Sequence, residues 1–231
     1  MAFQGYTQET VDFMWGIRFN NERGWFLEHK DDYINTFLTP TRELGEQVYD
    51  AVHALLPDEP LMLKVSRIYR DARRLFGRGP YKDHLWWCIR TGDKDWTGRP
   101  TFWFELGPDY YSFGLGFWSP AAALMETYRK QIDAHPEELS KLVRQFNRQS
   151  VFTLDGPEYA RSKGQTSDLL RPWYQKKSLS LRWEGSLDER IFTPALAEDI
   201  IAGFKTLIPF YHYFNKLVAL TPRQERRGEE A

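Results

Sequence analysis

The hydrophobic residues of the first 56 positions recur every three or four residues, which is the spacing of one buried helix face. The first such segment follows Thr7 and the second follows Asn21, and both residues have side chains suited to capping a helix. A third segment follows Thr39 and Pro40, a capping residue with proline at the first helical position. We therefore expect three helices before Pro57.

From Leu61 the hydrophobic pattern changes to a period of two, which is typical of half-buried strands. Connections of a few residues favour antiparallel neighbours, because parallel strands need crossovers of about a dozen residues or more. We expect a mainly antiparallel sheet over about residues 61–118, with two later strands added to it. The predicted strands are LMLKVSRIY, HLWWCIR, TFWFEL and YYSFGLGFW, followed by VFTLDG and KSLSLRW.

The fourth of these strands has two different faces. Alternation separates large side chains on one face from small ones on the other, and small residues allow another group to approach closely. The large side chains belong to Tyr111, Phe113, Leu115 and Phe117, and the small residues are Ser112, Gly114 and Gly116.

Helical patterns return after the sheet. Ser119–Pro120 and Thr193–Pro194 repeat the combination of a capping residue with proline, and Pro209 is expected to kink or divide the last helix. The order of helices, antiparallel sheet and helices predicts an α+β fold in which the C-terminal helices pack on the sheet. We expect a single domain over residues 1–220 and a charged, frayed tail over residues 221–231.

Composition excludes several classes of protein. Lys and Arg number 31 against 32 Asp and Glu, so the global charge predicts no general attraction to nucleic acid or to an anionic membrane. The single cysteine, Cys88, lies between apolar neighbours in a predicted strand, where packing is the expected role. There is no Cys/His cluster for a metal, no cofactor motif, no signal peptide and no apolar run of about 20 residues. We expect a cytoplasmic protein with no metal, no cofactor and no membrane contact.

Charge is nevertheless concentrated in one segment between Lys64 and Arg90. In the strand pattern Arg67 shares a face with Leu63 and Val65, so we expect its guanidinium to be mostly buried and bonded to an acid or an anion. The basic residues of this segment are Lys64, Arg67, Arg70, Arg73, Arg74, Arg78, Lys82 and Arg90, and its acids are Asp71 and Asp83.

Convergence of these side chains predicts a cleft for a small phosphate- or carboxylate-bearing ligand. Planar Arg side chains and Lys suit such anions, and Tyr adds a further donor. An enzymatic version uses His84 as acid or base, oriented by Asp71. The predicted ligand-binding residues are Arg67, Arg70, Arg73, Tyr81 and Lys82.

The same segment resembles an uncharacterised, mainly bacterial family known as domain of unknown function 2461. The family signature is R-x-x-R-D-x-R-F-x-x-D-K-x-P-Y-K, and a similar N-N-x-x-W-F motif occurs at NNERGWF near the N-terminus. The chain departs from the signature at Arg74, Gly77 and Arg78, where the family has Phe, Asp and Lys. The resemblance implies no known activity. The matching residues are Arg67, Arg70, Asp71, Arg73, Pro80, Tyr81 and Lys82.

Other functions find less support in the sequence. There is no phosphate-loop motif and no G-x-S-x-G nucleophile motif, which argues against an ordinary nucleoside-triphosphate site and a serine hydrolase. Aromatics interleaved with Arg also suit single-stranded nucleic acid, but the near-zero net charge argues against this partner. The alternative to the anion cleft is a non-catalytic protein-interaction module that uses exposed Trp and Arg. A concave pocket favours the ligand, and a flat aromatic patch favours the protein partner.

Overall fold

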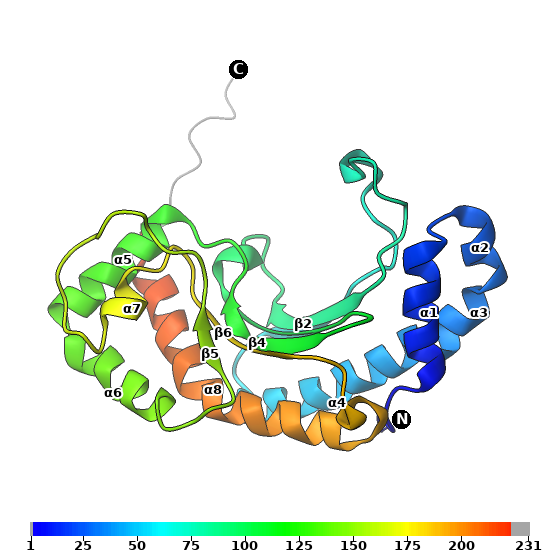
Figure 1. Ribbon diagram of the computed structural model, residues 1–231. Helices are drawn as coiled ribbons and strands as arrows, with labels where there is room; N and C mark the ends of the chain where they lie inside the picture. Colours follow the sequence, from blue (N-terminus) through cyan, green and yellow to red (C-terminus); the bar gives the residue numbers. More distant parts are fainter. Residues whose placement is uncertain (1, 223–231) are drawn as a thin grey trace.

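The structure of the protein is a computed structural model that describes residues 2–222. Helices precede the sheet and cover it, so the predicted α+β architecture is confirmed (Figure 1). The α-helices are α1 (Gln8–Phe19), α2 (Arg23–Glu28), α3 (Lys30–Asp32), α4 (Thr39–Leu55), α5 (Ala122–Ala134), α6 (Pro136–Phe146), α7 (Arg171–Tyr174) and α8 (Ala195–Leu220). A π-helix, η1 (Tyr33–Leu38), and three 3-10 turns, η2 (Ala72–Arg74), η3 (Trp96–Gly98) and η4 (Glu189–Phe192), complete the helical elements.

Six strands form one sheet in the order β1-β2-β3-β4-β6-β5, and every neighbouring pair is antiparallel. The first four strands are neighbours in sequence as well as in space, which confirms the antiparallel sheet predicted over residues 61–118. The strands are β1 (Leu61–Val65), β2 (Leu85–Thr91), β3 (Pro100–Leu106), β4 (Tyr111–Phe117), β5 (Thr153–Asp155) and β6 (Ser180–Gly185).

Helices α4 and α8 cover one face of the sheet (Figure 1). Phe204 of α8 is fully buried there, with ring centroids 4.8 Å from Phe102 and 6.1 Å from Phe113. Each aromatic ring of this kind removes about 200 Å² from water, so this layer supplies a large part of the hydrophobic stabilisation. The alternation predicted for β4 is confirmed, because Phe113 and its partners in the period-two pattern face this core.

The opposite face of the sheet, called the open face below, has no helix packed over it within the described residues (Figure 1). Strand register fixes which of its side chains are neighbours. One row contains Trp86, Glu105, Ser112 and Glu184, and the next contains Cys88, Trp103, Gly114 and Arg182.

Strands β4 and β6 approach each other very closely at Gly114 and Gly116. A Cβ atom at Gly114 would collide with the carbonyl oxygen of Leu181, and one at Gly116 would collide with that of Leu179. The small residues of β4 therefore leave room for the backbone of the neighbouring strand, β6. As a consequence, β4 contributes no side chain larger than that of Ser112 to the middle of the open face.

The third predicted helix starts at the expected place, but the prediction that Thr39 caps it is wrong. Helix α4 begins at Thr39, but Thr39 does not cap a free helix end, because the π-helix η1 continues directly into α4. Pro40 has no N–H to donate to the preceding turn. The carbonyl of Thr36 instead accepts a hydrogen bond of 2.6 Å from the hydroxyl of Thr10 in α1. A contact between helices thus supports the continuous helix at the proline.

The two later proline signals mark helix starts to within two residues. α8 begins directly after Pro194 and continues through Pro209, so this proline does not divide the last helix. α5 begins at Ala122, two residues beyond Pro120. The predicted frayed tail from residue 221 lies largely outside the described residues.

Residues 66–84, which we call the basic hairpin, connect β1 to β2 and rise beside α1 and α2 (Figure 1). Backbone hydrogen bonds of 2.8 Å join Lys82 N to Ile68 O and Arg70 N to Pro80 O. Asn21 completes the base of the hairpin: its Oδ1 accepts from Tyr81 N at 2.9 Å, and its Nδ2 donates to Tyr81 O at 2.9 Å. The N-cap of α2 is Glu22, so the prediction that Asn21 caps this helix is wrong.

We expect Asn21→Ala to lower the free energy of unfolding by about 2 kcal/mol, because two hydrogen bonds to the hairpin are lost at about 1 kcal/mol each. The matched control is Asn20→Ala, whose exposed side chain donates only to the Gly16 carbonyl among the described residues. That variant is expected to change stability by less than about 0.5 kcal/mol. Urea denaturation measures the free energy of unfolding of both variants. Equal losses of stability in Asn21→Ala and Asn20→Ala would contradict this role of Asn21.

Candidate functional site

The open face carries a cavity of about 430 Å³. Its size lies in the range of small-molecule sites. Tryptophan side chains form its walls, from strands β2 and β3 and from the segments at the ends of β3 and β4. Glycine and short hydroxyl side chains form much of the floor, because β4 is bare at this position. The lining residues are Trp86, Cys88, Trp96, Thr101, Trp103, Glu105, Ser112, Gly116, Phe117, Trp118, Asp155, Ser180 and Arg182.

Three of the tryptophans form a cluster at one side of the cavity. The ring of Trp118 lies 6.5 Å from that of Trp86 and 6.4 Å from that of Trp96, and both pairs are tilted. Trp118 is 72% exposed, which is unusual for the largest apolar side chain in proteins. The cluster therefore leaves a large aromatic surface without a partner from the described residues.

Three cations lie over tryptophan rings around the cavity. Arg90 lies 4.5 Å from the ring centre of Trp96, and Arg182 lies 5.9 Å from that of Trp103. The ammonium of Lys82 lies 5.6 Å from the ring centre of Trp86. Cation–π contacts of this kind fix the cations at the walls and cover one side of each ring.

The acidic groups of the cavity already have partners. Arg182 forms an ion pair with Glu184 and a second one of 3.6 Å with Asp155. The hydroxyl of Tyr110 donates to the carboxylate of Glu105, and burial together with this carboxylate raises the pKa of Tyr110. The carboxylates are thus held in fixed positions by the protein itself.

Lys82 differs from these groups because it is partly buried and forms no ion pair with another described residue. The pKa of Lys82 is lowered to about 8, mainly by desolvation and also by the guanidiniums of Arg70 and Arg67, while the carboxylate of Glu105 acts in the opposite direction. The unpaired charge at the edge of the cavity is therefore positive.

The prediction that Arg67 is buried is wrong. Its side chain is exposed and forms no hydrogen bond or ion pair with another described residue. Strand β1 ends at Val65, four residues before the end of the predicted strand at Tyr69, so Arg67 does not share the apolar face of Leu63. It is an exposed cation that lowers the pKa of Lys82, less strongly than Arg70 does.

Arg70 and Tyr81 hold the hairpin together. Arg70 Nε donates to the carbonyl of Tyr81 at 2.8 Å, and its Nη2 lies 4.0 Å from Asp83. The ring of Tyr81 is 4% exposed and stacks on Phe26 of α2 at 4.3 Å. These contacts position the residue that follows, Lys82.

Arg73 and Asp71 pair with each other in the outer part of the hairpin, at 2.8 Å, where the Arg73 side chain is 87% exposed. Among the five predicted ligand-binding residues, the structure shows a contact with the cavity lining for Lys82, through Trp86. The expected convergence is partial: Arg70 and Arg67 act on Lys82, whereas Arg73 pairs with Asp71 and the ring of Tyr81 packs on Phe26.

His84 has an acidic partner, but it is not Asp71. Its Nδ1 lies 2.9 Å from Asp83 Oδ1, while Arg18 Nε donates to Asp83 Oδ2 at 2.7 Å. The hydrogen bonds from His84 and Arg18 lower the pKa of Asp83 well below its usual range. Asp83 is thus the residue that orients His84, and its place directly before His84 in the sequence was the available signal.

Two other sequence expectations concern cysteine and metals. Cys88 is 4% exposed in the cavity floor, and burial raises the pKa of its thiol to about 11, so the neutral form dominates near pH 7.

Within the part of the chain that the structure describes, no group of three His, Cys, Asp or Glu side chains is placed to hold a metal ion. Nor do the described residues contain a helix long and apolar enough to cross a membrane.

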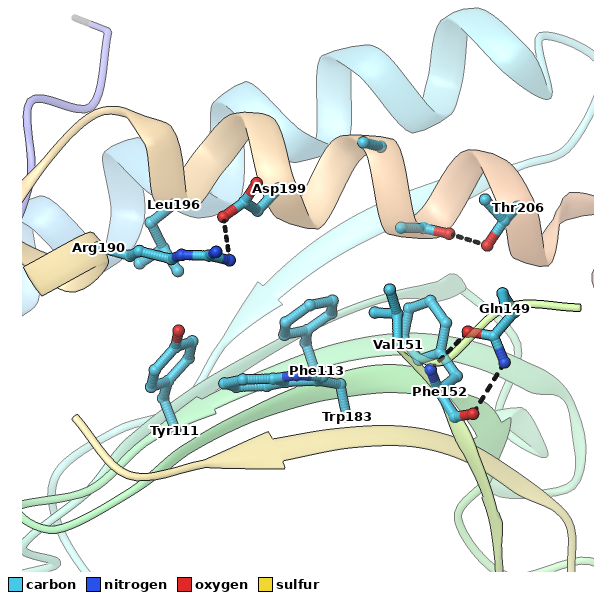
Figure 2. Close-up of a pocket in the computed structure, with 12 residues that line it drawn as sticks. Tyr111, Phe113, Gln149, Val151, Phe152, Trp183, Arg190, Leu196, Asp199 and Thr206 are labelled. Atoms are coloured by element: carbon cyan, nitrogen blue, oxygen red, sulfur yellow. Dashed lines mark hydrogen bonds and ion pairs between the residues drawn. The ribbon is translucent and has the colours of Figure 1, made fainter. Parts of the chain in front are cut away.

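A second cavity of about 280 Å³ lies between α8 and the core face of the sheet (Figure 2). Tyr111, Phe113 and Trp183 form its floor, and the rings of Phe113 and Trp183 are 5.2 Å apart. Its cation, Arg190, is paired with Asp199 at 3.0 Å. This cavity therefore has no unpaired charge among the described residues.

Lys82 gives a direct test of these electrostatics. We expect the Lys82 ammonium, observed by NMR after ¹³C-methylation of lysines, to titrate near pH 8 instead of the ordinary 10.5. The folded state loses this proton at a lower pH than the unfolded state does. The contribution of Lys82 to the free energy of unfolding therefore rises as the pH increases from about 8 to 10.5. Lys82→Met should therefore raise the free energy of unfolding at pH 7, on the order of 1 kcal/mol, and the gain should shrink towards pH 10.5. A midpoint near 10.5 would contradict the partial burial of an unpaired charge.

Comparison with known proteins gives the family of the chain. No curated protein matches the sequence. The model of a family described as a conserved hypothetical protein, DUF2461, matches residues 9–213, which include the N-terminal helices, the basic hairpin and the whole sheet. The chain therefore belongs to the DUF2461 family of conserved hypothetical proteins.

Proposed function

We propose that the cavity on the open face binds a small ligand that carries a phosphate or carboxylate group. Lys82 contacts the anionic group, and the tryptophan walls pack against the rest of the ligand. The observation that carries this proposal is the partly buried ammonium of Lys82 beside a cavity of ligand size. Lys82 forms no ion pair within the described residues, although the carboxylate of Glu105 acts on it from a distance. A partly buried, unpaired charge is costly, and a bound anion would offset that cost.

The other predicted residues take supporting roles in this proposal. Arg67 is exposed and close enough to influence Lys82, so it serves as a second cation that attracts the ligand. Arg70 and Tyr81 hold the backbone of the hairpin in the geometry that directs Lys82 towards Trp86. Arg73, paired with Asp71 in the outer hairpin, has no part in the binding of the anion.

A catalytic form of this function uses His84 with Asp83. Asp83 fixes the imidazole through Nδ1, which leaves Nε2 as the nitrogen that exchanges a proton with a ligand. The side chain of His84 is 26% exposed, so solvent and ligand reach it from the open side. The clamp of Arg18 on Asp83 keeps that carboxylate ionised.

The alternative function is a protein-interaction module. Two exposed aromatic side chains favour it: Trp118, which is 72% exposed, and Phe76 in the basic hairpin, which is 83% exposed. Interface hot spots are rich in Trp and Arg. The tryptophans of the open face nevertheless surround a concavity, and this shape favours the small ligand.

The test is a thermal-shift screen with small phosphates and carboxylates, followed by calorimetry on the compounds that stabilise the protein. Lys82→Met is expected to weaken binding by roughly ten- to a hundredfold, because a charge-assisted hydrogen bond is worth about 1.5 to 3 kcal/mol. Matched controls are Lys205→Met, which removes an exposed lysine of α8 on the other side of the sheet, and Arg73→Ala, which removes an exposed cation of the hairpin.

Both control variants should bind the anion within about threefold of the wild type, since neither residue contacts the cavity lining in this proposal. Equal losses in all three variants would mean that only general electrostatic attraction is present. Absence of any stabilising anion would remove the support for the proposal and favour a protein partner.

A further inference from the structure

The lining of the open-face cavity has a chemical character that narrows the class of ligand. Its walls are aromatic, its floor is hydroxylic, and its lining contains no Leu, Ile, Val, Met or Ala. The cavity beside α8 is different, because Val151, Leu196 and Ala202 line it together with aromatic rings. An aliphatic ligand would fit the cavity beside α8 better than the cavity on the open face.

Hydroxyl groups stand on three adjacent strands of the floor. Thr101 of β3 and Ser180 of β6 lie in one row with Gly116 between them, and Ser112 lies further along β4. The hydroxyl of Ser112 forms no hydrogen bond with another described residue, although the residue is only 1% exposed. A hydroxyl both donates and accepts hydrogen bonds, so this floor matches a ligand that itself carries several hydroxyl groups.

Charged groups at the edges add fixed acceptors and donors. Glu105 is held by Tyr110, and Asp155 is held by Arg182. A carboxylate offers several lone pairs and a guanidinium several N–H groups, so each of these groups can serve a ligand hydroxyl while keeping its own partner. They lie on different strands, which spreads the polar contacts around the ligand.

The tryptophans do not suit a nucleobase held between two rings. A base that stacks between two parallel rings needs about 7 Å between those rings, because each of the two contacts takes about 3.5 Å. Trp86 and Trp118 are 6.5 Å apart and tilted by 33°. A single exposed ring face instead suits a row of C–H groups, because their slight positive charge is attracted to the negative face of the aromatic ring.

A pyranose ring presents both features: C–H groups on its face and hydroxyls around its edge. Building on the proposed anion site, we infer that the ligand class of this cavity is an acidic sugar, a polyhydroxylated ring that carries a carboxylate or phosphate group. The ring lies against Trp118, its hydroxyls contact Ser112 and Asp155, and its acidic group contacts Lys82.

Calorimetric titration of the full chain tests this inference with four probes. Glucuronate and glucose 6-phosphate carry both features, with carboxylate and phosphate as the acidic group. Glucose has the hydroxyls without the charge, and phenyl phosphate has the charge without the hydroxyls. We expect at least one acidic sugar to bind at least about tenfold more tightly than glucose and than phenyl phosphate.

Asp155→Asn separates the sugar contact from the anion contact. Asn keeps the shape and the oxygen that accepts from Gly156 N, but it removes the carboxylate. It should weaken binding of the acidic sugar by about tenfold without weakening that of phenyl phosphate, since Lys82 is intact and Arg182 keeps its ion pair with Glu184. Asp168→Asn, which changes an exposed acid of the 156–170 connection, is the control.

Two results would overturn the inference. If phenyl phosphate binds as tightly as the acidic sugars and depends on Lys82, the anion site stands and the sugar assignment fails. If none of the four probes binds, the sugar assignment fails as well, and the anion site then depends on the wider screen of phosphates and carboxylates.

Discussion

The open face of the sheet depends on the close contact between the backbones of β4 and β6. Gly114 and Gly116 permit this contact, because a Cβ atom at either position would collide with a carbonyl oxygen of the neighbouring strand. The same residues leave the middle of the open face without side chains, while Phe113 and Leu115 fill the core on the other side of β4. One strand thus closes the core and creates the floor of the cavity.

A second constraint connects the N-terminal helices to the cavity. Asn21 and Arg70 both donate to the carbonyl of Tyr81, and the ring of Tyr81 packs on Phe26. These contacts fix the backbone at the point where the basic hairpin rejoins the sheet. Lys82 and His84 follow directly, so the hydrogen bonds of the hairpin determine the positions of the two residues to which we assign chemistry. The N-N-x-x-W-F segment and the P-Y-K segment are therefore parts of one structural unit.

Much of the fold follows from sequence patterns, because strand alternation and short turns are local signals. The two faces of β4 are an example. Arg67 was placed wrongly because alternation does not show where a strand ends. Arg182 was missed because its position beside Trp103 depends on the pairing of β4 with β6, across a long connection in sequence. The sequence analysis expects Asp71 to orient His84, but in the structure Asp71 pairs with Arg73. Spacing along the sequence alone does not show which of these partners an acid takes.

The central claim is that a ligand occupies the open face beside Lys82. Fluorine NMR of protein labelled with 5-fluorotryptophan tests it most directly, because the tryptophans mark both cavities and the core. With an anion that stabilises the protein, the resonances of Trp86, Trp103 and Trp118 are predicted to shift, while those of Trp173 in the core and Trp183 in the second cavity stay unchanged. A shift confined to Trp183, or binding that leaves the three open-face tryptophans unaffected, would contradict the claim.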